Sequence, residues 1–278
     1  MQEKDILTIA NALRVANAEA VLPRFRNLSP QQLKTKSSVN DLVTVADREA
    51  EALIFDALQS GFIDCELIGE ESYHANDDLA AILKNTDLAF IIDPIDGTWH
   101  FAHGSPSFAT LVAVVSRGEV IAGVNYEPIT QQYQWAIKGE GAFETGSWGT
   151  RKLQVPAQNK DLCDVIGCIP INNFSGVEQA GILEAIPSIG RSMDYLCSAM
   201  EYRLGCAGAL GFHLHNGNLK CWDHAAGVLI ASESGMMVAY TDGTPYDPGL
   251  QTGQLLVAES ESRWHEIRDL FGLNARSN

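Results

Sequence analysis

Two carboxylates three residues apart, Asp93 and Asp96, are the residues in this sequence best placed to do chemistry. They follow a short apolar run, residues 88–92, which predicts a buried strand. Pro94 pre-sets the backbone of a turn, and Gly97 allows a conformation that a Cβ would resist. The pattern therefore predicts a rigid loop at a strand end that holds both acids in fixed positions.

Such a loop would direct several oxygen atoms to one point. These are the carboxylates of Asp93 and Asp96, the hydroxyl of Thr98 and the carbonyl of Ile95. Hard divalent cations, Mg²⁺ in particular, are held by a few carboxylates together with water and substrate phosphate. A surface Asp-Gly turn is the alternative. The apolar strand in front favours a metal site, because it places the acids where water is partly excluded.

Composition limits the classes of function. The 278 residues suffice for one large domain or two smaller ones, and 46% hydrophobic with 19% charged residues is typical of a soluble globular protein. A net charge of −16 and a pI near 4.7 argue against a nucleic-acid or anionic-membrane partner. An acidic protein also repels phosphate esters, so bound cations would have to reverse the local sign.

Cysteine usage and the N-terminus indicate the compartment. The six cysteines form no CxxC pair and no zinc-ligand spacing, which favours reduced, buried thiols in a cytoplasmic protein. The sequence shows neither the regions of a signal peptide nor an apolar run near ~18 residues. We therefore expect no membrane segment.

The N-terminal half predicts helices followed by strands. Thr44 with Asp47 three residues later forms a capping box, which by itself explains Asp47. Glu70 and Glu71 read as a solvated turn unless Glu70 converges on the Asp93 loop. The periodicity predicts helices over 3–27, 44–59 and 76–85 and strands over 66–68, 108–116, 119–126 and 131–137. Pro23 is expected to end or kink the first helix near the residue before it.

The C-terminal half alternates strands and helices after a turn-rich bridge at 138–162. We expect one domain, 1–278, with an N-terminal lobe over about 1–145 and a C-terminal lobe over about 150–278. The pattern predicts strands at 164–169, 212–215, 236–240 and 254–258 and helices at 175–185, 195–210, 223–234 and 262–270. This alternation indicates a layered fold of helices and sheets.

Four motifs together resemble the inositol monophosphatase family, a group of metal-dependent, lithium-sensitive phosphatases. They are DLVTVAD at 41–47, IGEES at 68–72, DPIDGT at 93–98 and WDxAAG at 222–227, in the family's order and spanning nearly the whole chain. The resemblance implies an α+β fold, a layered α/β/α/β/α sandwich that is commonly a homodimer. It also implies a Mg²⁺-dependent phosphomonoesterase acting on a small polyol or sugar phosphate.

The resemblance implies two to three Mg²⁺ ions per subunit. Glu70, Asp93 and the Ile95 carbonyl would bind the first, and Asp93, Asp96 and Asp223 the second. A third ion is expected near Glu70, with Lys36 and Glu71 in its vicinity. Carboxylates gathered in this way repel one another by about 4 kcal/mol per close pair at an effective dielectric constant near 20, so such a cluster calls for cations.

The resemblance also assigns catalytic roles. Asp47 would orient Thr98, and Thr98 with Glu70 would orient and deprotonate the attacking water. The N–H groups of Gly97 and Thr98 would receive the phosphate. The implied reaction is direct hydrolysis by metal-activated water, without a side-chain nucleophile. Li⁺ is expected to inhibit at the second metal position.

Departures from the family gather at the expected substrate contacts, Ser198, Ala199 and Asn216. Cys197 stands where glycine is usual, and Asn216 replaces the glutamate that grips inositol hydroxyls; it can hydrogen-bond a hydroxyl but not with a charge. Other departures are Phe212 in place of an aspartate, His100 in place of an asparagine, and His224, which either starts a helix or supports Asp223.

The resemblance makes inositol-1-phosphate the default substrate. The departures count against inositol and leave histidinol phosphate, fructose-1,6-bisphosphate and 3′-phosphoadenosine 5′-phosphate open. A non-catalytic regulatory binding protein is the alternative from another class. A Ca²⁺-binding structural domain fits poorly, because the acids are dispersed rather than packed into one loop.

Overall fold

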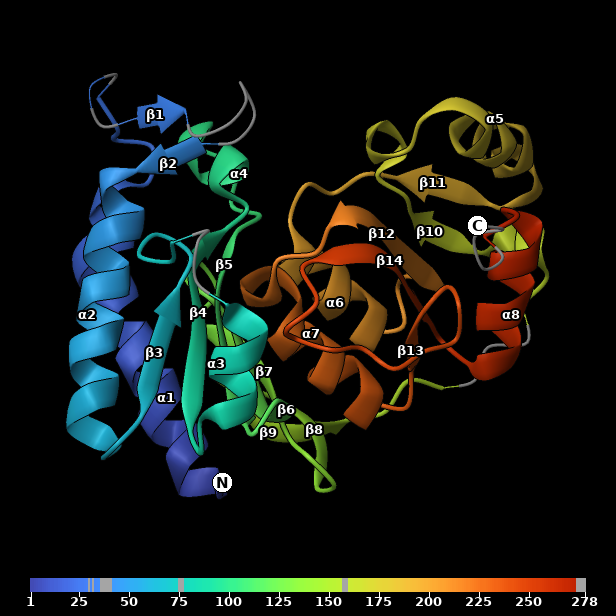
Figure 1. Cartoon of the computed structure of the whole chain (residues 1–278). Coiled ribbons are helices and arrows are strands. Elements are labelled where there is room, and N and C mark those ends of the chain that lie inside the picture. The colour runs from blue at the N-terminus through green and yellow to red at the C-terminus, as the bar shows by residue number, and fades with distance from the viewer. Residues whose placement is uncertain (30, 32, 36–41, 75–77, 157–159, 274–278) are drawn as a thin grey trace.

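Two β-sheets and three layers of helices alternate across the molecule (Figure 1), which is a computed structural model describing residues 1–29, 31, 33–35, 42–74, 78–156 and 160–273. Helices α1 and α2 cover the outer face of a seven-stranded sheet. Helices α6 and α7 fill the space between this sheet and a five-stranded one. Helices α5 and α8 cover the far face of the second sheet. The predicted α/β/α/β/α layering is confirmed.

The helices have the following bounds: α1 Glu3–Ala16, α2 Val45–Gly61, α3 Leu79–Asn85, α4 Thr98–Ala102, α5 Gly176–Ala185, α6 Ser198–Cys206, α7 Cys221–Glu233 and α8 Glu261–Leu270. The seven-stranded sheet contains β3 Glu66–Gly69, β4 Ala89–Asp96, β5 Ala109–Ser116, β6 Glu119–Glu127, β7 Gln132–Ile137, β8 Gly141–Gly146 and β9 Gly149–Leu153, in that order. The five-stranded sheet has the order β11 Arg191–Met193, β10 Ile166–Cys168, β12 Phe212–Asn218, β14 Thr252–Ala258 and β13 Met237–Tyr240. A small hairpin joins β1 Leu33–Thr35 to β2 Leu42–Thr44.

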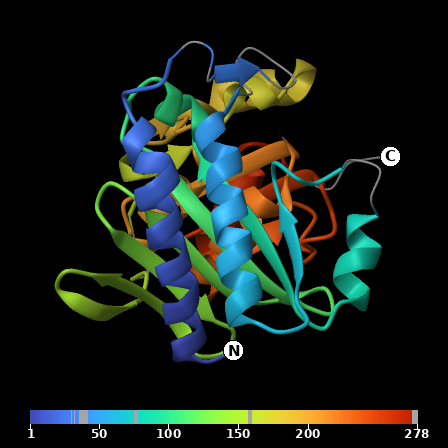
Figure 2. The same ribbon diagram turned by 90° about the vertical axis from the view of Figure 1, so that its left-hand side faces the viewer.

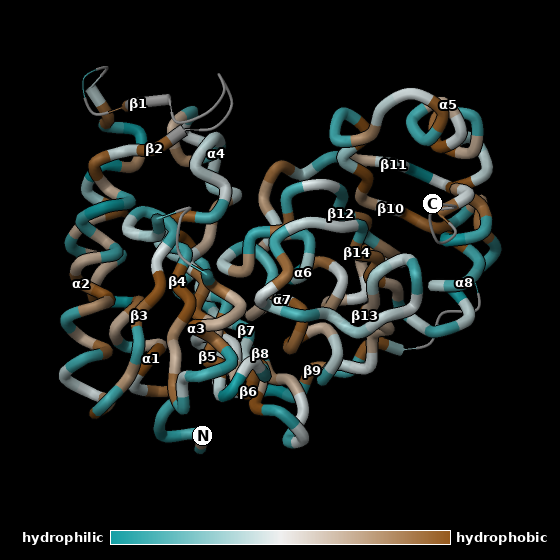
Figure 3. The backbone as a smooth tube through the Cα atoms, viewed as in Figure 1, coloured by the Kyte–Doolittle hydropathy of each residue, from teal (hydrophilic) through white to brown (hydrophobic). Residues whose placement is uncertain are grey.

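Strand β4 is buried along its whole length, which accounts for the apolar sequence of residues 89–92 ahead of its two aspartates (Figure 3). Phe90 and Ile92 point to the side covered by α1 and α2, two helices that run next to each other over the sheet (Figure 2). Ala89 and Ile91 point to the opposite side, toward α7. Strand β4 is thus fixed from both faces, and its carboxyl end is held rigidly.

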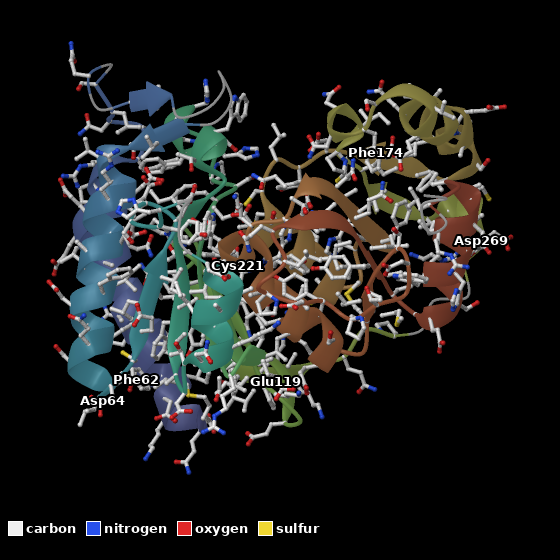
Figure 4. The ribbon with its side chains drawn as sticks, in the orientation of Figure 1. Phe62, Asp64, Glu119, Phe174, Cys221 and Asp269 are labelled. Carbon is white, nitrogen blue, oxygen red and sulfur yellow. The ribbon has the colours of Figure 1, made fainter. Side chains whose placement is uncertain are left out.

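Helix α7 is the central element of the middle layer. Cys221 at its start lies between the two halves of the molecule (Figure 4). The helix contacts β4, β5, β6, β7 and β8 on one side and β13 on the other. Because it is enclosed, its sequence from Cys221 to Ala231 is almost entirely apolar or small, and Asp223 is the acidic residue in its first turn.

Several predicted boundaries differ from the structure. The first helix stops at Ala16 and continues as a π-helical turn, Asn17–Val21, and a 3₁₀ turn, Leu22–Arg24, because Pro23 cannot continue an α-helix. The helix predicted over 195–210 is only α6. The turn-rich stretch 138–162 contains the β8–β9 hairpin, which extends the first sheet and was not predicted.

Two findings bear on the expected environment. In the described part of the chain, no helix is both long enough and apolar enough to cross a bilayer. All six cysteines are free, and four of them are buried, but Cys163 is exposed and Cys65 half-buried. The expectation that every thiol is buried was therefore wrong for these two.

Candidate active site

The carboxyl ends of β3 and β4 bring the first two acids together. These strands pair in parallel with Gly69 opposite Ile92, and the N–H of Glu70 donates to the carbonyl of Ile92 at 3.1 Å. Glu70 and Asp93 therefore leave adjacent strands at the same edge of the sheet, which is where α/β proteins commonly place ligands.

The strand pairing is irregular after Asp93. The pairing of β4 with β5 shifts register between Asp93 and Asp96, so β4 continues through the predicted turn as a bulged strand. The N–H of Ile95 donates to Asp93 Oδ1 at 3.0 Å. Gly97 has φ +84°, and a Cβ there would lie 2.9 Å from the Ser107 carbonyl oxygen, so only glycine fits.

Asp96 lies against the start of α6. Its carboxylate accepts a hydrogen bond from the N–H of Ala199, and the Cys197 thiol lies 3.5 Å from the same oxygen. Burial raises the pKa of Asp96 to about 6, and these hydrogen bonds limit the rise. Ala199, an expected substrate contact, thus donates its N–H to a candidate metal ligand.

Asp93 shows that the dispersed acids converge. It is 1% exposed, and burial is the main reason that its pKa is raised well above the usual range. The negative charges of Glu70, Asp96, Asp223 and Asp47 raise the pKa further, in that order. Acids from β3, β4, α2 and α7 thus lie within electrostatic range of one buried carboxyl.

Asp47 occupies the capping box predicted for it. Its Oδ2 accepts from the N–H of Thr44 at 2.7 Å and from the Thr44 hydroxyl at 2.5 Å. Its Oδ1 is buried without a hydrogen-bond partner in the described part of the chain, and burial raises the pKa of Asp47 to about 7. The hydroxyl of Thr98 donates instead to the Ile95 carbonyl at 2.9 Å, so the expected Asp47–Thr98 hydrogen bond is not seen.

Glu51 is a site residue that the sequence reading missed. One turn after Asp47 on α2, it is 5% exposed, and its Oε2 accepts from the N–H of Glu71 at 2.9 Å. The Ser72 side chain also hydrogen-bonds to it. A Cβ on Gly69 would lie 2.1 Å from its carboxylate, so the loop that carries Glu70 rests directly on Glu51. The i, i+4 spacing from Asp47 was the available signal.

The surroundings expected for a third ion are only partly described. The carboxylate of Glu71 lies 3.8 Å from the guanidinium of Arg48, and its charge also raises the pKa of Asp47. Lys36 lies outside the described residues.

The donor set suits a hard cation. Glu70, Asp93, Asp96 and Asp223 offer only oxygen, and the orphaned Oδ1 of Asp47 adds an unsatisfied buried acceptor beside them. Mg²⁺ prefers such oxygen ligands and retains water and phosphate. The residues present therefore fit the divalent ions that the sequence implies.

A pocket of about 240 Å³ opens on the Asp96 and Asp223 side of this cluster. Ser198 and Asn216, both predicted substrate contacts, line it; the Nδ2 of Asn216 already donates to the Asn173 carbonyl at 2.6 Å. The described lining includes four acids and no lysine or arginine: Asp96, Asp194, Glu201 and Asp223 are the acids.

The other departures from the family have structural explanations. Phe212 is fully buried in the second sheet, packed over Gly167. His100 joins α4 to the segment before α6, with Nε2 2.7 Å from the Tyr195 carbonyl oxygen. His224 is buried with Nδ1 3.2 Å from the Tyr202 hydroxyl, so its side chain pairs with Tyr202.

Mg²⁺ should stabilise the fold more strongly as pH rises. Asp96 and Asp47 have pKa values raised above 3.8, so the folded state holds extra protons between pH 4 and about 7 and loses stability across that range, by about 1.4 kcal/mol per pKa unit for each group. A cation bound to the carboxylates opposes this loss. Thermal unfolding with EDTA and with Mg²⁺ should show a Tm difference near zero at pH 5 that grows through pH 7.

Burial lowers the pKa values of His213, His215 and His224, so these residues change the stability with pH in the opposite direction. Their contribution is the same in EDTA and in Mg²⁺ and cancels in the Tm difference. The Asp96→Asn variant should show a smaller growth of the Mg²⁺ effect. An effect that is constant from pH 5 to 8 would contradict the cluster of raised carboxyl pKa values.

Replacing Glu51 should weaken the binding of Mg²⁺ indirectly. Glu51→Ala leaves the N–H of Glu71 without its acceptor, which costs about 1–3 kcal/mol, and frees the loop that carries Glu70. We expect the Mg²⁺ concentration for half-maximal activity to rise about 10-fold or more, with partial recovery of kcat at high Mg²⁺. Asp56→Asn, on the exposed face of the same helix, is the matched control. An unchanged Mg²⁺ dependence would show that the loop needs no such support.

Comparisons with known proteins agree with this geometry. The family model described as "Inositol monophosphatase family" matches residues 2–270. The chain is 32% identical over 213 residues to the fructose-1,6-bisphosphatase/inositol-1-monophosphatase of Thermotoga maritima, covering 76% of each protein. It is 30% identical over 252 residues to the Nus factor SuhB of Haemophilus influenzae, covering 86% of each.

A solved structure gives the same result for the fold. The IMPase of Thermotoga maritima superposes with a TM-score of 0.79 at 25% identity, over 98% of both chains. The acid cluster, the layered fold and the match along the sequence lead to one conclusion. The chain belongs to the inositol monophosphatase family and is a phosphatase of the phosphoric monoester hydrolase class.

Proposed function

We propose that this phosphatase is Mg²⁺-dependent and hydrolyses a small polyol or sugar monophosphate by direct attack of water. The observation that carries the proposal is the convergence of Glu70, Asp96 and Asp223 on buried Asp93, an all-oxygen set from three segments of the chain. Glu70, Asp93 and the Ile95 carbonyl would hold one ion, and Asp93, Asp96 and Asp223 the other. When bound, the ions would lower the pKa of a water molecule and offset charge on the phosphate oxygens.

The protein groups have separate tasks in this proposal. Glu70 accepts the proton of the attacking water. The Thr98 hydroxyl orients that water after giving up its hydrogen bond to the Ile95 carbonyl. The N–H groups of Gly97 and Thr98 receive the phosphate. Asp47 fixes the start of α2 through Thr44, and its free Oδ1 remains available to a neighbouring donor.

The pocket beside the cluster limits which alcohols could be the leaving group. Its described lining has four acids and no lysine or arginine, so no cationic side chain there would pair with a second phosphate on the substrate. This favours a single phosphate on a neutral polyol such as inositol-1-phosphate, or on a cationic alcohol such as histidinol phosphate. Fructose-1,6-bisphosphate and 3′-phosphoadenosine 5′-phosphate are the less favoured substrates.

A panel of these four esters, assayed with and without Mg²⁺, tests the proposal. We expect Mg²⁺-dependent phosphate release from a monophosphate, inhibition by Li⁺, and kcat/KM at least about 10-fold lower for the two substrates with a second phosphate, a difference of about 1.4 kcal/mol. Absence of turnover on every ester would refute the enzymatic proposal. Indifference to Li⁺ would count against the assignment of Asp96 and Asp223.

A regulatory binding role is the second candidate, because one relative carries the name Nus factor SuhB. The Asp96→Asn variant separates the two roles. If the folded variant loses turnover and also fails to replace the wild-type protein in cells, the cellular role depends on catalysis. If it loses turnover but still replaces the wild-type protein, the role is binding. A homodimer and a cytoplasmic location also remain predictions, which light scattering and cell fractionation would test.

A further inference from the structure

A second cluster of metal-ligating side chains lies beneath the pocket, apart from the carboxylates around Asp93. Glu201 comes from α6, and His213 and His215 come from the same face of β12, two residues apart. One ligand atom from each side chain lies within 4.8 Å of the others. The three residues are 5%, 0% and 7% exposed.

The hydrogen bonds of this cluster leave one ring nitrogen unsatisfied, although Glu201 is hydrogen-bonded by the Cys168 thiol and by the backbone of Tyr195. His213 Nδ1 lies 2.9 Å from His215 Nε2, so one of the two nitrogens donates and the other accepts. His215 Nδ1 and the nearer Glu201 oxygen are 3.6 Å apart, which is too long for a hydrogen bond. His213 Nε2 is buried and has no hydrogen-bond partner among the described residues. A buried nitrogen left unsatisfied requires a physical reason.

The cluster also lacks a fixed positive charge. Among the ion pairs of the described residues, Glu201 has only His215 as its partner. Burial lowers the pKa of His215 to about 3 and that of His213 well below the usual range, so both rings are neutral at physiological pH. Neutral imidazoles offer lone pairs, and neutral imidazole is the form that binds metals.

Two imidazole nitrogens and one carboxylate oxygen form a donor set for zinc-like metals rather than for Mg²⁺. Neighbouring groups support such a set: the Cys168 thiol hydrogen-bonds to Glu201, and the rings of His215 and His224 lie 4.5 Å apart, centroid to centroid. We propose that Glu201, His213 and His215 bind a borderline divalent cation such as Zn²⁺, at a site distinct from the oxygen-only cluster.

The proposed site opens onto the pocket. Glu201 and His215 both line it, together with Asp223 from the first cluster. A cation at the second site would be reachable from the pocket that receives the leaving group. It would replace the proton of Glu201, whose pKa burial raises to about 8. The proposal concerns binding alone, so its failure would leave the phosphatase proposal unaffected.

Cobalt binding to the full-length protein provides the test. After removal of bound metals with a chelator, the protein is saturated with Mg²⁺ and titrated with Co²⁺. We expect one equivalent of Co²⁺ to bind in excess Mg²⁺, with the visible absorption of nitrogen-ligated Co²⁺, and to be displaced by Zn²⁺. Co²⁺ that is competed away by Mg²⁺, or that shows no nitrogen ligation, would overturn the proposal.

Variants locate the ion. Glu201→Gln and His213→Gln should lower the affinity for Co²⁺ at least about 10-fold. Asp223→Asn, in the oxygen-only cluster, should retain it. His265→Gln is the matched control, because His265 lies on α8 with a neighbouring glutamate but is exposed. Equal binding by all four variants would contradict the assignment.

A measurement on the unaltered protein covers the case in which buried variants fail to fold. With Mg²⁺ present, Zn²⁺ should shift the ring nitrogen NMR signals of His213 and His215 and leave that of His265 in place. Unshifted signals for His213 and His215 at one equivalent of Zn²⁺ would refute the site.

Discussion

Replacing Asp93 by asparagine should abolish turnover while leaving the fold intact. Asp93 is the acid on which the other carboxylates converge and would be shared by both ions. Losing it removes several kcal/mol of charge stabilisation, so kcat should fall about 10³-fold or more. Steady-state phosphate release at saturating Mg²⁺, with circular dichroism to confirm folding, measures the effect.

The same substitution should relieve repulsion when Mg²⁺ is removed. Asparagine carries no charge, whereas burial and the neighbouring acids both destabilise a negative charge at position 93. We therefore expect a higher Tm than that of the wild type in EDTA at pH 8. Asp87→Asn, at the exposed start of the same segment and paired with Arg117, is the control and should change neither quantity appreciably. Retention of a tenth of the activity by Asp93→Asn would contradict the shared role.

Glu70→Gln should show the second largest loss. Glutamine keeps the size of the side chain and one oxygen but cannot accept a proton from water at neutral pH. Because general-base assistance is worth about 10²–10⁴-fold, we expect kcat to fall in that range. The pH–rate profile distinguishes the base from a simple ligand, since loss of the base should also remove the acidic limb of the profile.

Glu66→Gln provides the control for Glu70, because Glu66 is exposed at the opposite end of the same strand. A Glu70→Gln enzyme that recovers full kcat at high Mg²⁺ would show that Glu70 only holds the ion. A pH–rate profile of Glu70→Gln identical to that of the wild type would also show that Glu70 is not the general base.

Local sequence patterns predicted those elements whose boundaries are set by neighbouring residues. The capping box of Thr44 and Asp47 starts α2 as expected, and the apolar run before Asp93 forms a buried strand. The β8–β9 hairpin was missed because its polar, glycine-rich strands have the composition of a loop and become strands only by pairing with β7. The secondary structure of that segment is therefore set by tertiary pairing rather than by local propensity.

The candidate site was predictable to the extent that it lies in compact motifs. Glu70, Asp93 and Asp96 came from short segments, but their convergence depends on the parallel pairing of β3 and β4, which no local pattern reveals. Glu51 and Glu201 were missed for the same reason. In the sequence each is an ordinary acidic residue of a helix. Glu51 is distinguished only by its burial against the loop of Glu71, and Glu201 by its burial beside His215.

The most direct test of the phosphatase account is a crystal structure of the protein grown with Mn²⁺ and phosphate, using the anomalous signal of manganese. The account predicts anomalous peaks enclosed by Glu70, Asp93, Asp96 and Asp223, with phosphate beside Asp93 and close to the N–H groups of Gly97 and Thr98. Absence of manganese from these four carboxylates, in a protein that still hydrolyses phosphate esters in the same buffer, would contradict it.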